Sequence, residues 1–187
     1  LSEGDLLEIL RSPKSSVVLS KQRDFRAYGI DVDFEDEALQ RLARLAHGEH
    51  TGARGLVSAV EKILLEYERR LPSAPVEAFT VTADVVADPD GQLQPLLASH
   101  SLRHFIETFK ADHGIDLSFT EAGAAAVKSL AQAQDRPPSE VCTELLADYG
   151  HGLKLLERSA FEIDEDVVNR PQECLNALIR ALYSDRG

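Results

Sequence analysis

The feature that most constrains the fold of this chain is an internal repeat. Residues 29–34 (Gly-Ile-Asp-Val-Asp-Phe) recur as residues 114–119 (Gly-Ile-Asp-Leu-Ser-Phe), at an offset of 85 (114 − 29). A second pair follows in the same order, because residues 79–89 share Phe, Asp, Val, Val and Pro with residues 161–171, at an offset of 82 (161 − 79). Chance similarity between strand-like segments is the alternative. Two anchors in one order favour a duplicated small domain.

Helix signals open the first copy. Ser2 and Asp5 form a capping pair for a short helix, which Pro13 ends. Ser12, with Pro13 at the first helical position, is expected to start a second helix that runs to Gly29.

Two further helices and two short strands are expected before the second copy. Apolar residues recur at helical spacing in residues 36–46 and again in residues 51–71. Residues 30–34 alternate apolar and acidic side chains, and residues 79–81 also have a strand-like composition. Residues 88–91 (Asp-Pro-Asp-Gly) predict a turn. The expected fold class is therefore α+β and mostly helical, a duplicated helical bundle with short strands.

In the second copy, two prolines and a terminal helix stand out. Pro137 and Pro138 are expected to start one helix whose apolar side comprises Val141, Cys142, Leu145, Leu146 and Tyr149. Residues 171–183 read as a final helix with Cys174, Leu175, Leu178, Ile179 and Leu182 facing inward.

Arg54 is the main candidate site residue. Thr51 is expected to cap the helix that follows, which places Arg54 in its first turn, where a cation faces the positive end of the helix dipole. This costs roughly 0.3–1 kcal/mol relative to an acidic residue, so helix stability does not explain the choice. Gly52 and Gly55 would let another backbone or a phosphate chain come close. An ordinary exposed arginine is the alternative interpretation.

Several separated segments together resemble the C-terminal small domain of ClpX-type AAA+ unfoldases. They are residues 1–10, 12–14, 25–34, 51–56 and 71–73, and the resemblance extends from Leu1 to about Leu97. In that family the Gly-Ala-Arg-Gly-Leu motif is sensor 2, whose arginine contacts the phosphates of ATP. The resemblance assigns this role to Arg54, with Gly52, Ala53 and Gly55 as the supporting turn. HslU-type unfoldases carry a similar motif and remain open.

The resemblance implies an AAA+ small-domain-like helical bundle, a division of the chain and a set of partners. Residues 1–97 would be the small (lid) domain, and residues 98–187 a diverged second copy. The full-length protein would bind ATP or ADP with Mg²⁺ and form a cytoplasmic homo-hexamer, in which the small domain contacts the large domains of its own and the neighbouring subunit. A Clp-type peptidase and protein substrates are further possible partners. The alternative function is a non-enzymatic adaptor or assembly module derived from an ATPase lid.

The second copy does not keep the arginine in register. At the offset of 85, Ser139 takes the place of Arg54, and Arg136 that of Thr51. Pro137 and Pro138 also remove amide donors that an anion site would use. A structural or partner-binding role is expected for this copy.

Composition and absent motifs limit the other possibilities. The net charge of −12 argues against binding nucleic acid or anionic lipid, and no apolar run is long enough to span a bilayer. The chain contains no Gly-x-x-x-x-Gly-Lys-Ser/Thr loop, so it is not expected to cleave ATP alone, and no catalytic residue is assigned. It begins at Leu1 and contains no methionine, which indicates a fragment or a processed product.

The histidines and cysteines are weaker candidates. His100, His104 and Glu107 have helical spacing, but apolar residues compete for the same face, so no metal site is assigned. His47 and His50 are interpreted as loop residues near Arg54. The two cysteines lie within apolar helical patterns and are expected to be buried free thiols in a reducing compartment.

Overall fold

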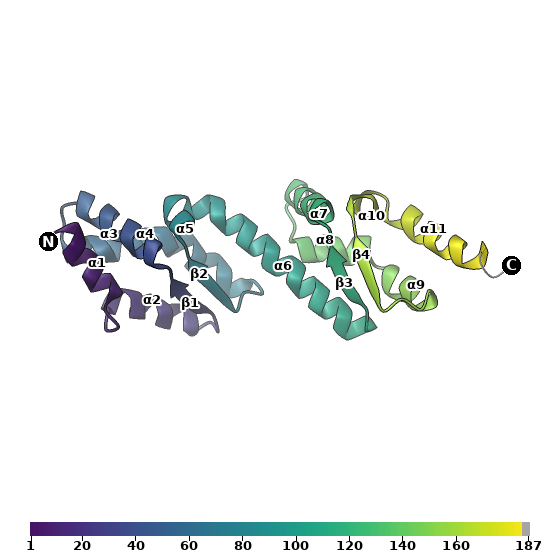
Figure 1. The fold of residues 1–187 in the computed structure, drawn as a ribbon, viewed down its shortest axis with the longest axis horizontal. Helices are drawn as coiled ribbons and strands as arrows, with labels where there is room; N and C mark the ends of the chain where they lie inside the picture. Colours follow the sequence, from purple (N-terminus) through teal and green to yellow (C-terminus); the bar gives the residue numbers. More distant parts are fainter. Residues whose placement is uncertain (185–187) are drawn as a thin grey trace. The chain divides into compact units, whose positions relative to one another are not determined.

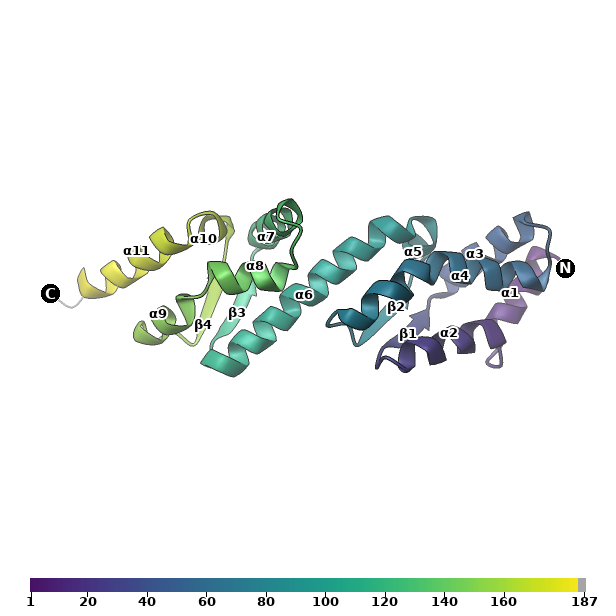
Figure 2. The same ribbon diagram turned by 180° about the vertical axis from the view of Figure 1, so that it is seen from behind.

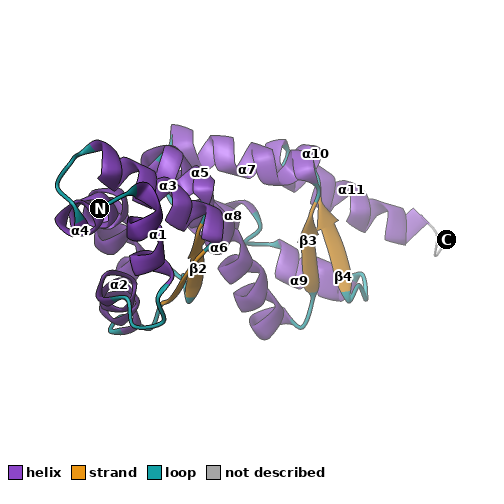
Figure 3. Cartoon of the chain, turned by 60° about the vertical axis from the view of Figure 1, so that its left-hand side comes forward, coloured by secondary structure: helices purple, strands orange, loops and turns teal. Residues whose placement is uncertain are grey.

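The chain folds into two compact units. The computed structural model describes residues 1–184, and the units comprise Leu1–Leu97 (unit 1) and Ala98–Gly187 (unit 2). Each unit combines several helices with one two-stranded parallel sheet (Figures 1 and 3). This agrees with the predicted α+β, mostly helical fold class.

Unit 1 begins with two helices, and each of its two strands is then followed by helices. Its elements are α1 (Glu3–Arg11), α2 (Ser16–Arg26), β1 (Asp31–Phe34), α3 (Asp36–Gly48), α4 (Ala53–Arg70), the 3-10 turn η1 (Leu71–Ser73), β2 (Ala78–Val81) and α5 (Ala83–Ala87). The next helix, α6 (Pro89–His113), begins in unit 1 and ends in unit 2.

Unit 2 repeats this order from the first strand onward. Its further elements are β3 (Asp116–Phe119), α7 (Glu121–Ala133), α8 (Pro138–Leu145), α9 (Tyr149–Leu155), β4 (Ala160–Ile163), α10 (Glu165–Asn169) and α11 (Pro171–Ser184).

The two sheets have equivalent registers. In unit 1, Asp31 lies opposite Ala78, and in unit 2 Asp116 lies opposite Ala160, with parallel strands in both. These pairs are related by the two sequence offsets, 85 for the first strand and 82 for the second. The structure therefore confirms two similar units, and the sequence anchors mark their paired strands.

Local capping explains where the first helices begin. Ser2 and Asp5 form the predicted capping box of α1, with both reciprocal hydrogen bonds present. The prediction that α2 starts at Pro13 is wrong. The N–H of Ser15 donates to the carbonyl oxygen of Ser12, which closes a turn, and the helix begins only at Ser16.

The predicted turn at residues 88–91 is also wrong, because α6 begins there. The Asp88 carboxylate accepts a hydrogen bond from the N–H of Gly91, and the Asp88 carbonyl accepts one from Gln92. Asp88 thus satisfies first-turn amides, as a helix N-cap does, and Pro89 is tolerated as the first helical residue.

One continuous helix in unit 1 corresponds to two short helices in unit 2. Figure 2 shows α8 and α9 as separate helices, so the prediction of a single helix that includes Tyr149 is wrong. The offset falls from 85 to 82 between them, so unit 2 lacks three residues of the α4 sequence. Residues 146–148, between the two helices, form a turn.

Each unit has its own hydrophobic core. That of unit 1 is built around Phe25, Leu56, Leu64, Tyr67 and Phe79, and that of unit 2 around Phe105, Phe109, Tyr149, Leu153 and Ile163. Cys142 is buried, whereas Cys174 is only half-buried, and both are free thiols. In α11, Leu175 is buried, and the other apolar residues predicted to face inward are only partly covered.

Candidate functional site

The candidate site lies where α4 begins. The N-cap is Gly52, with φ 63° and ψ −141°, so the prediction that Thr51 caps this helix is wrong. No side chain caps α4, because the chain enters it through a left-handed residue, a conformation that glycine adopts without steric cost.

Gly55, in the first turn of α4, is buried against α3. A Cβ atom added at Gly55 would lie 3.0 Å from the carbonyl oxygen of Ala46 and 2.6 Å from Oγ1 of Thr51. The missing side chain therefore lets the α3 backbone approach α4, and this close contact fixes the start of the helix that carries Arg54.

Arg54 is exposed on the first turn of α4. Within residues 1–184, its guanidinium makes no hydrogen bond or ion pair, and the backbone N–H groups of Ala53 and Arg54 reach no acceptor. The N–H of Gly55 bonds instead to the carbonyl oxygen of Gly52. This end of α4 thus presents one unpaired cation and two free amide donors.

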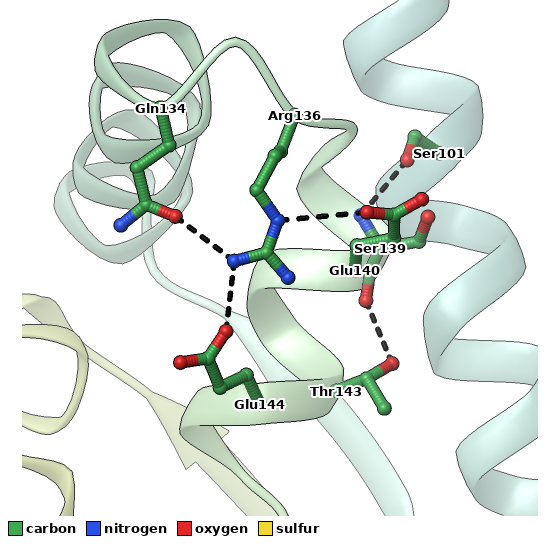
Figure 4. Close-up of polar contacts among 7 residues, drawn as sticks. All are labelled: Ser101, Gln134, Arg136, Ser139, Glu140, Thr143 and Glu144. Atoms are coloured by element: carbon green, nitrogen blue, oxygen red, sulfur yellow. Dashed lines mark hydrogen bonds and ion pairs between the residues drawn. The ribbon is translucent and has the colours of Figure 1, made fainter.

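In unit 2, the backbone amides at the same position are hydrogen-bonded within the unit. The N–H of Ser139, the counterpart of Arg54, donates to Oγ of Ser101 at 2.9 Å (Figure 4). Ser101 is only 5% exposed. The N–H groups of Glu140 and Val141 both donate to the carbonyl oxygen of Pro137. No first-turn amide of α8 in this described region is left for an external anion.

Arg136 is likewise occupied. Its guanidinium donates to Glu144 at 2.8 Å, to Gln134 at 3.2 Å and to Glu140 at 3.5 Å (Figure 4). The hydrogen bond to Glu144, opposed by desolvation, raises the pKa of Arg136 above its usual value. Two carboxylates therefore neutralise the one arginine at this corner of unit 2.

Sequence reasoning assigned no role to Ser101 or Glu144. Neither position carries a recognisable motif, and their partners become neighbours only when α6, α7 and α8 pack. Ser101 is a small polar residue directly before the apolar Leu102, and this position is the sequence feature that could have drawn attention to it.

The histidines are the other candidate residues that the sequence suggested. His47 lies in the last turn of α3, so its interpretation as a loop residue is wrong. His50 precedes α4, and the ring centroids of the two histidines are 6.3 Å apart. His100 and His104 both lie in α6, where Phe105 is buried and His104 is exposed. In the described part of the chain, no three His, Cys, Asp or Glu side chains gather as a metal site.

The cysteine thiols do not resemble activated nucleophiles. Burial raises the pKa of Cys142 to about 12. Burial also raises the pKa of Cys174, although Arg170 opposes this shift. Both thiols therefore stay protonated near neutral pH.

No helix in residues 1–184 is both long and apolar enough to cross a membrane.

Comparison with known proteins places the first part of the chain in a family. Residues 1–68 match the family described as the C-terminal, D2-small domain of ClpB protein. Over 73 residues the chain is 37% identical to the ATP-dependent Clp protease ATP-binding subunit ClpX of Treponema denticola. That alignment covers 39% of this chain and 18% of the relative, so the chain spans less than a fifth of that protein.

The matched segment includes α1, α2, β1, α3 and most of α4, and thus Arg54 and its glycines. Residues 1–68 of this chain therefore belong to the C-terminal small domains of Clp-type AAA+ ATPases, with distant homology to ClpX.

Proposed function

We propose that unit 1 is the nucleotide-sensing lid of an AAA+ ATPase and that Arg54 contacts the phosphates of ATP or ADP. The observation that carries this proposal is the unpaired Arg54 guanidinium beside two free amides at the start of α4. An arginine fork suits phosphate oxygens, and the helix N-terminus adds positive potential.

The residues at this site suit a phosphate contact, and they lack ligands for a metal. Gly52, Ala53 and Gly55 have no bulky side chain to shield the amides, and Arg54 is exposed. The chain has no Gly-x-x-x-x-Gly-Lys-Ser/Thr loop, so Mg²⁺ and most of the nucleotide would be held by a preceding large domain. Arg54 would then tie the position of unit 1 to the nucleotide state, so that hydrolysis moves it as a rigid body.

The parent protein on this proposal is a ClpX-type or HslU-type hexameric unfoldase. The matching relative is named as the ATP-binding subunit of an ATP-dependent Clp protease. We extend to this chain an assembly in which unit 1 contacts the large domains of its own and the neighbouring subunit. Protein substrates and a Clp-type peptidase are the further partners.

Unit 2 favours a second candidate function, a non-enzymatic adaptor or assembly module. Its counterpart of Arg54 is Ser139, and Arg136 is held by Glu140 and Glu144. A unit with these contacts has a structural or partner-binding role, and no phosphate-sensing group stands at its counterpart of Arg54. Native mass spectrometry of the intact natural protein distinguishes the two functions, because only the unfoldase requires a hexameric ring.

The experiment that tests the proposal substitutes Arg54 in the intact natural protein. Arg54→Ala should weaken ADP binding or slow ATP hydrolysis by roughly 10-fold or more, the effect of losing a charged hydrogen bond. Arg54→Lys should recover part of the loss, because the ammonium keeps the charge without the fork. Arg41→Ala removes another exposed cation of unit 1 and should leave both quantities unchanged. Wild-type turnover and nucleotide affinity in Arg54→Ala would contradict the assignment.

A further inference from the structure

A cavity of about 330 Å³ lies in unit 1 between the end of α2 and the last turn of α4. We call it the α2–α4 cavity. Two carboxylates, two aromatic rings and an alanine line it: Asp24, Phe25, Ala27, Tyr28 and Glu68. Pockets for small ligands measure roughly 300–1,000 Å³, so the volume suits a small group. Glu68 lies 14 residues after Arg54 (68 − 54), or about 21 Å along the helix, so the cavity is separate from the candidate site at Arg54.

The α2–α4 cavity has a surplus of negative charge. The ammonium group of Lys21 lies 2.6 Å from the Glu68 carboxylate and 3.9 Å from that of Asp24. One ammonium group therefore serves two carboxylates, and its close contact is with Glu68. Within residues 1–184 no group donates a hydrogen bond to the Asp24 carboxylate, whose side chain is 54% exposed. The carboxylate of Asp24 is thus available to a second cation.

Unit 2 fills the equivalent place with a side chain of its own. Tyr28 corresponds to His113 at the offset of 85, and Glu68 corresponds to Gly150 at the offset of 82. A Cβ atom added at Gly150 would lie 2.6 Å from Nε2 of His113, so the imidazole ring occupies the space beside this glycine. The ring centroid also lies 4.5 Å from that of Phe109. Tyr28, by contrast, is 66% exposed. A flat nitrogen-containing group thus fills in unit 2 the place of the cavity in unit 1.

We propose that the α2–α4 cavity binds a guanidinium group, from an arginine side chain of another protein chain or from a free arginine compound. The Asp24 carboxylate can accept two parallel hydrogen bonds from the flat fork of a guanidinium. The ring of Tyr28 adds a cation–π contact. An anion would be repelled by both carboxylates, and an apolar group would bury them without a partner. This proposal does not depend on the role of Arg54.

The test is an NMR titration of the 187-residue chain with an acetylated Gly-Arg-Gly peptide amide. Amide resonances at the ends of α2 and α4 should shift and saturate. A peptide with citrulline in place of arginine should not bind, because its urea group has the same shape and no charge. Asp24→Asn should weaken binding roughly 2- to 5-fold, the effect of losing one exposed ion pair. Glu61→Gln is the matched control, at an exposed acid of α4 that does not line the cavity, and should bind as wild type.

A second variant and a second ligand complete the test. Tyr28→Leu keeps an apolar side chain without the ring and should also weaken binding by roughly 2- to 5-fold. Arginine amide distinguishes the two sources of the group. Affinity equal to that of the peptide would support a free arginine compound, and weaker affinity would support an arginine of a protein chain. Equal binding of the arginine and citrulline peptides, wild-type affinity in Asp24→Asn, or no saturable binding would overturn the proposal.

Discussion

The hydroxyl of Tyr67 donates a hydrogen bond of 2.9 Å to the carbonyl oxygen of Pro89. Tyr67 is fully buried near the end of α4 and Pro89 is the first residue of α6, so the bond joins the helices on either side of β2. Tyr149 and Pro171 repeat this bond in unit 2 at 2.8 Å. The offset of 82 therefore already applies at Tyr149, which places the three-residue shortening before α9.

Tyr67→Phe should cost about 1 kcal/mol of unfolding free energy, the typical net contribution of one hydrogen bond. The ring keeps its stacking on Phe79, with centroids 5.4 Å apart, so only the hydroxyl is lost. Urea denaturation of the 187-residue chain measures the loss. Tyr28→Phe, at an exposed tyrosine, is the control and should leave the stability unchanged. Equal effects of the two substitutions would contradict the role of the buried bond.

Tyr67 should also contribute to an alkaline loss of stability. Burial, and then the charges of Asp90 and Asp88, raise the pKa of Tyr67 from 10.0 to about 12. Below pH 10 the tyrosine is neutral in both states and its contribution is complete. Between pH 10 and about 12 the unfolded tyrosine ionises first, so the stability falls as pH rises. Unfolding free energies across this range should fall less steeply for Tyr67→Phe, and identical slopes would refute the prediction.

Gly55→Ala should destabilise unit 1 by about 1–3 kcal/mol. The new methyl group would meet the Ala46 carbonyl oxygen at 3.0 Å, which forces α3 and α4 apart. Gly48→Ala is the matched control, because a Cβ atom there meets nothing within 4 Å and alanine favours a helix. Thermal unfolding of both variants should give opposite signs. A neutral Gly55→Ala would show that the helices adjust without cost.

Ser101→Ala should destabilise unit 2 by about 1–2 kcal/mol, because it leaves the Ser139 N–H without its acceptor at the start of α8. Ser129→Ala changes an exposed serine of another helix, so it controls for the helix preference of alanine. Chemical denaturation compares the two variants. The prediction fails if Ser101→Ala is as stable as its control.

Arg136→Ala should lower the unfolding free energy only slightly despite its several partners, because Glu140 and Glu144 are exposed and their pairs with Arg136 are screened by water. The loss should shrink further when the ionic strength is raised to 1 M. Unfolding experiments at low and high salt measure both values. A large loss that does not depend on salt would instead indicate that Arg136 supports the packing of α7 on α8.

Local sequence signals sufficed for much of the fold. Ser2 and Asp5 start α1 through hydrogen bonds within one helical turn. The apolar residues of α3 and α4 recur at helical spacing because each helix buries one face, so this spacing located both helices. The repeat of residues 29–34 located both first strands. The predicted caps Ser12 and Thr51 are wrong, because the helices begin after Ser15 and Gly52 instead.

The break between α8 and α9 was not visible in the local pattern. The spacing of Leu145, Leu146 and Tyr149 is compatible with one apolar helix face. In the structure, however, the hydroxyl of Tyr149 donates to the carbonyl oxygen of Pro171, a residue that lies much later in unit 2. The break therefore depends on packing between elements that are distant in the sequence.

The sequence by itself determined the fold class, the repeat and the presence of an arginine in the first turn of α4, because each is written in short-range spacing. Only the tertiary structure decided that Arg54 is unpaired while Arg136 is occupied by Glu140 and Glu144. It also decided that Ser101 closes the start of α8. The physical reason is that the accessibility of a charge or an amide depends on which side chains the packing of distant helices places beside it.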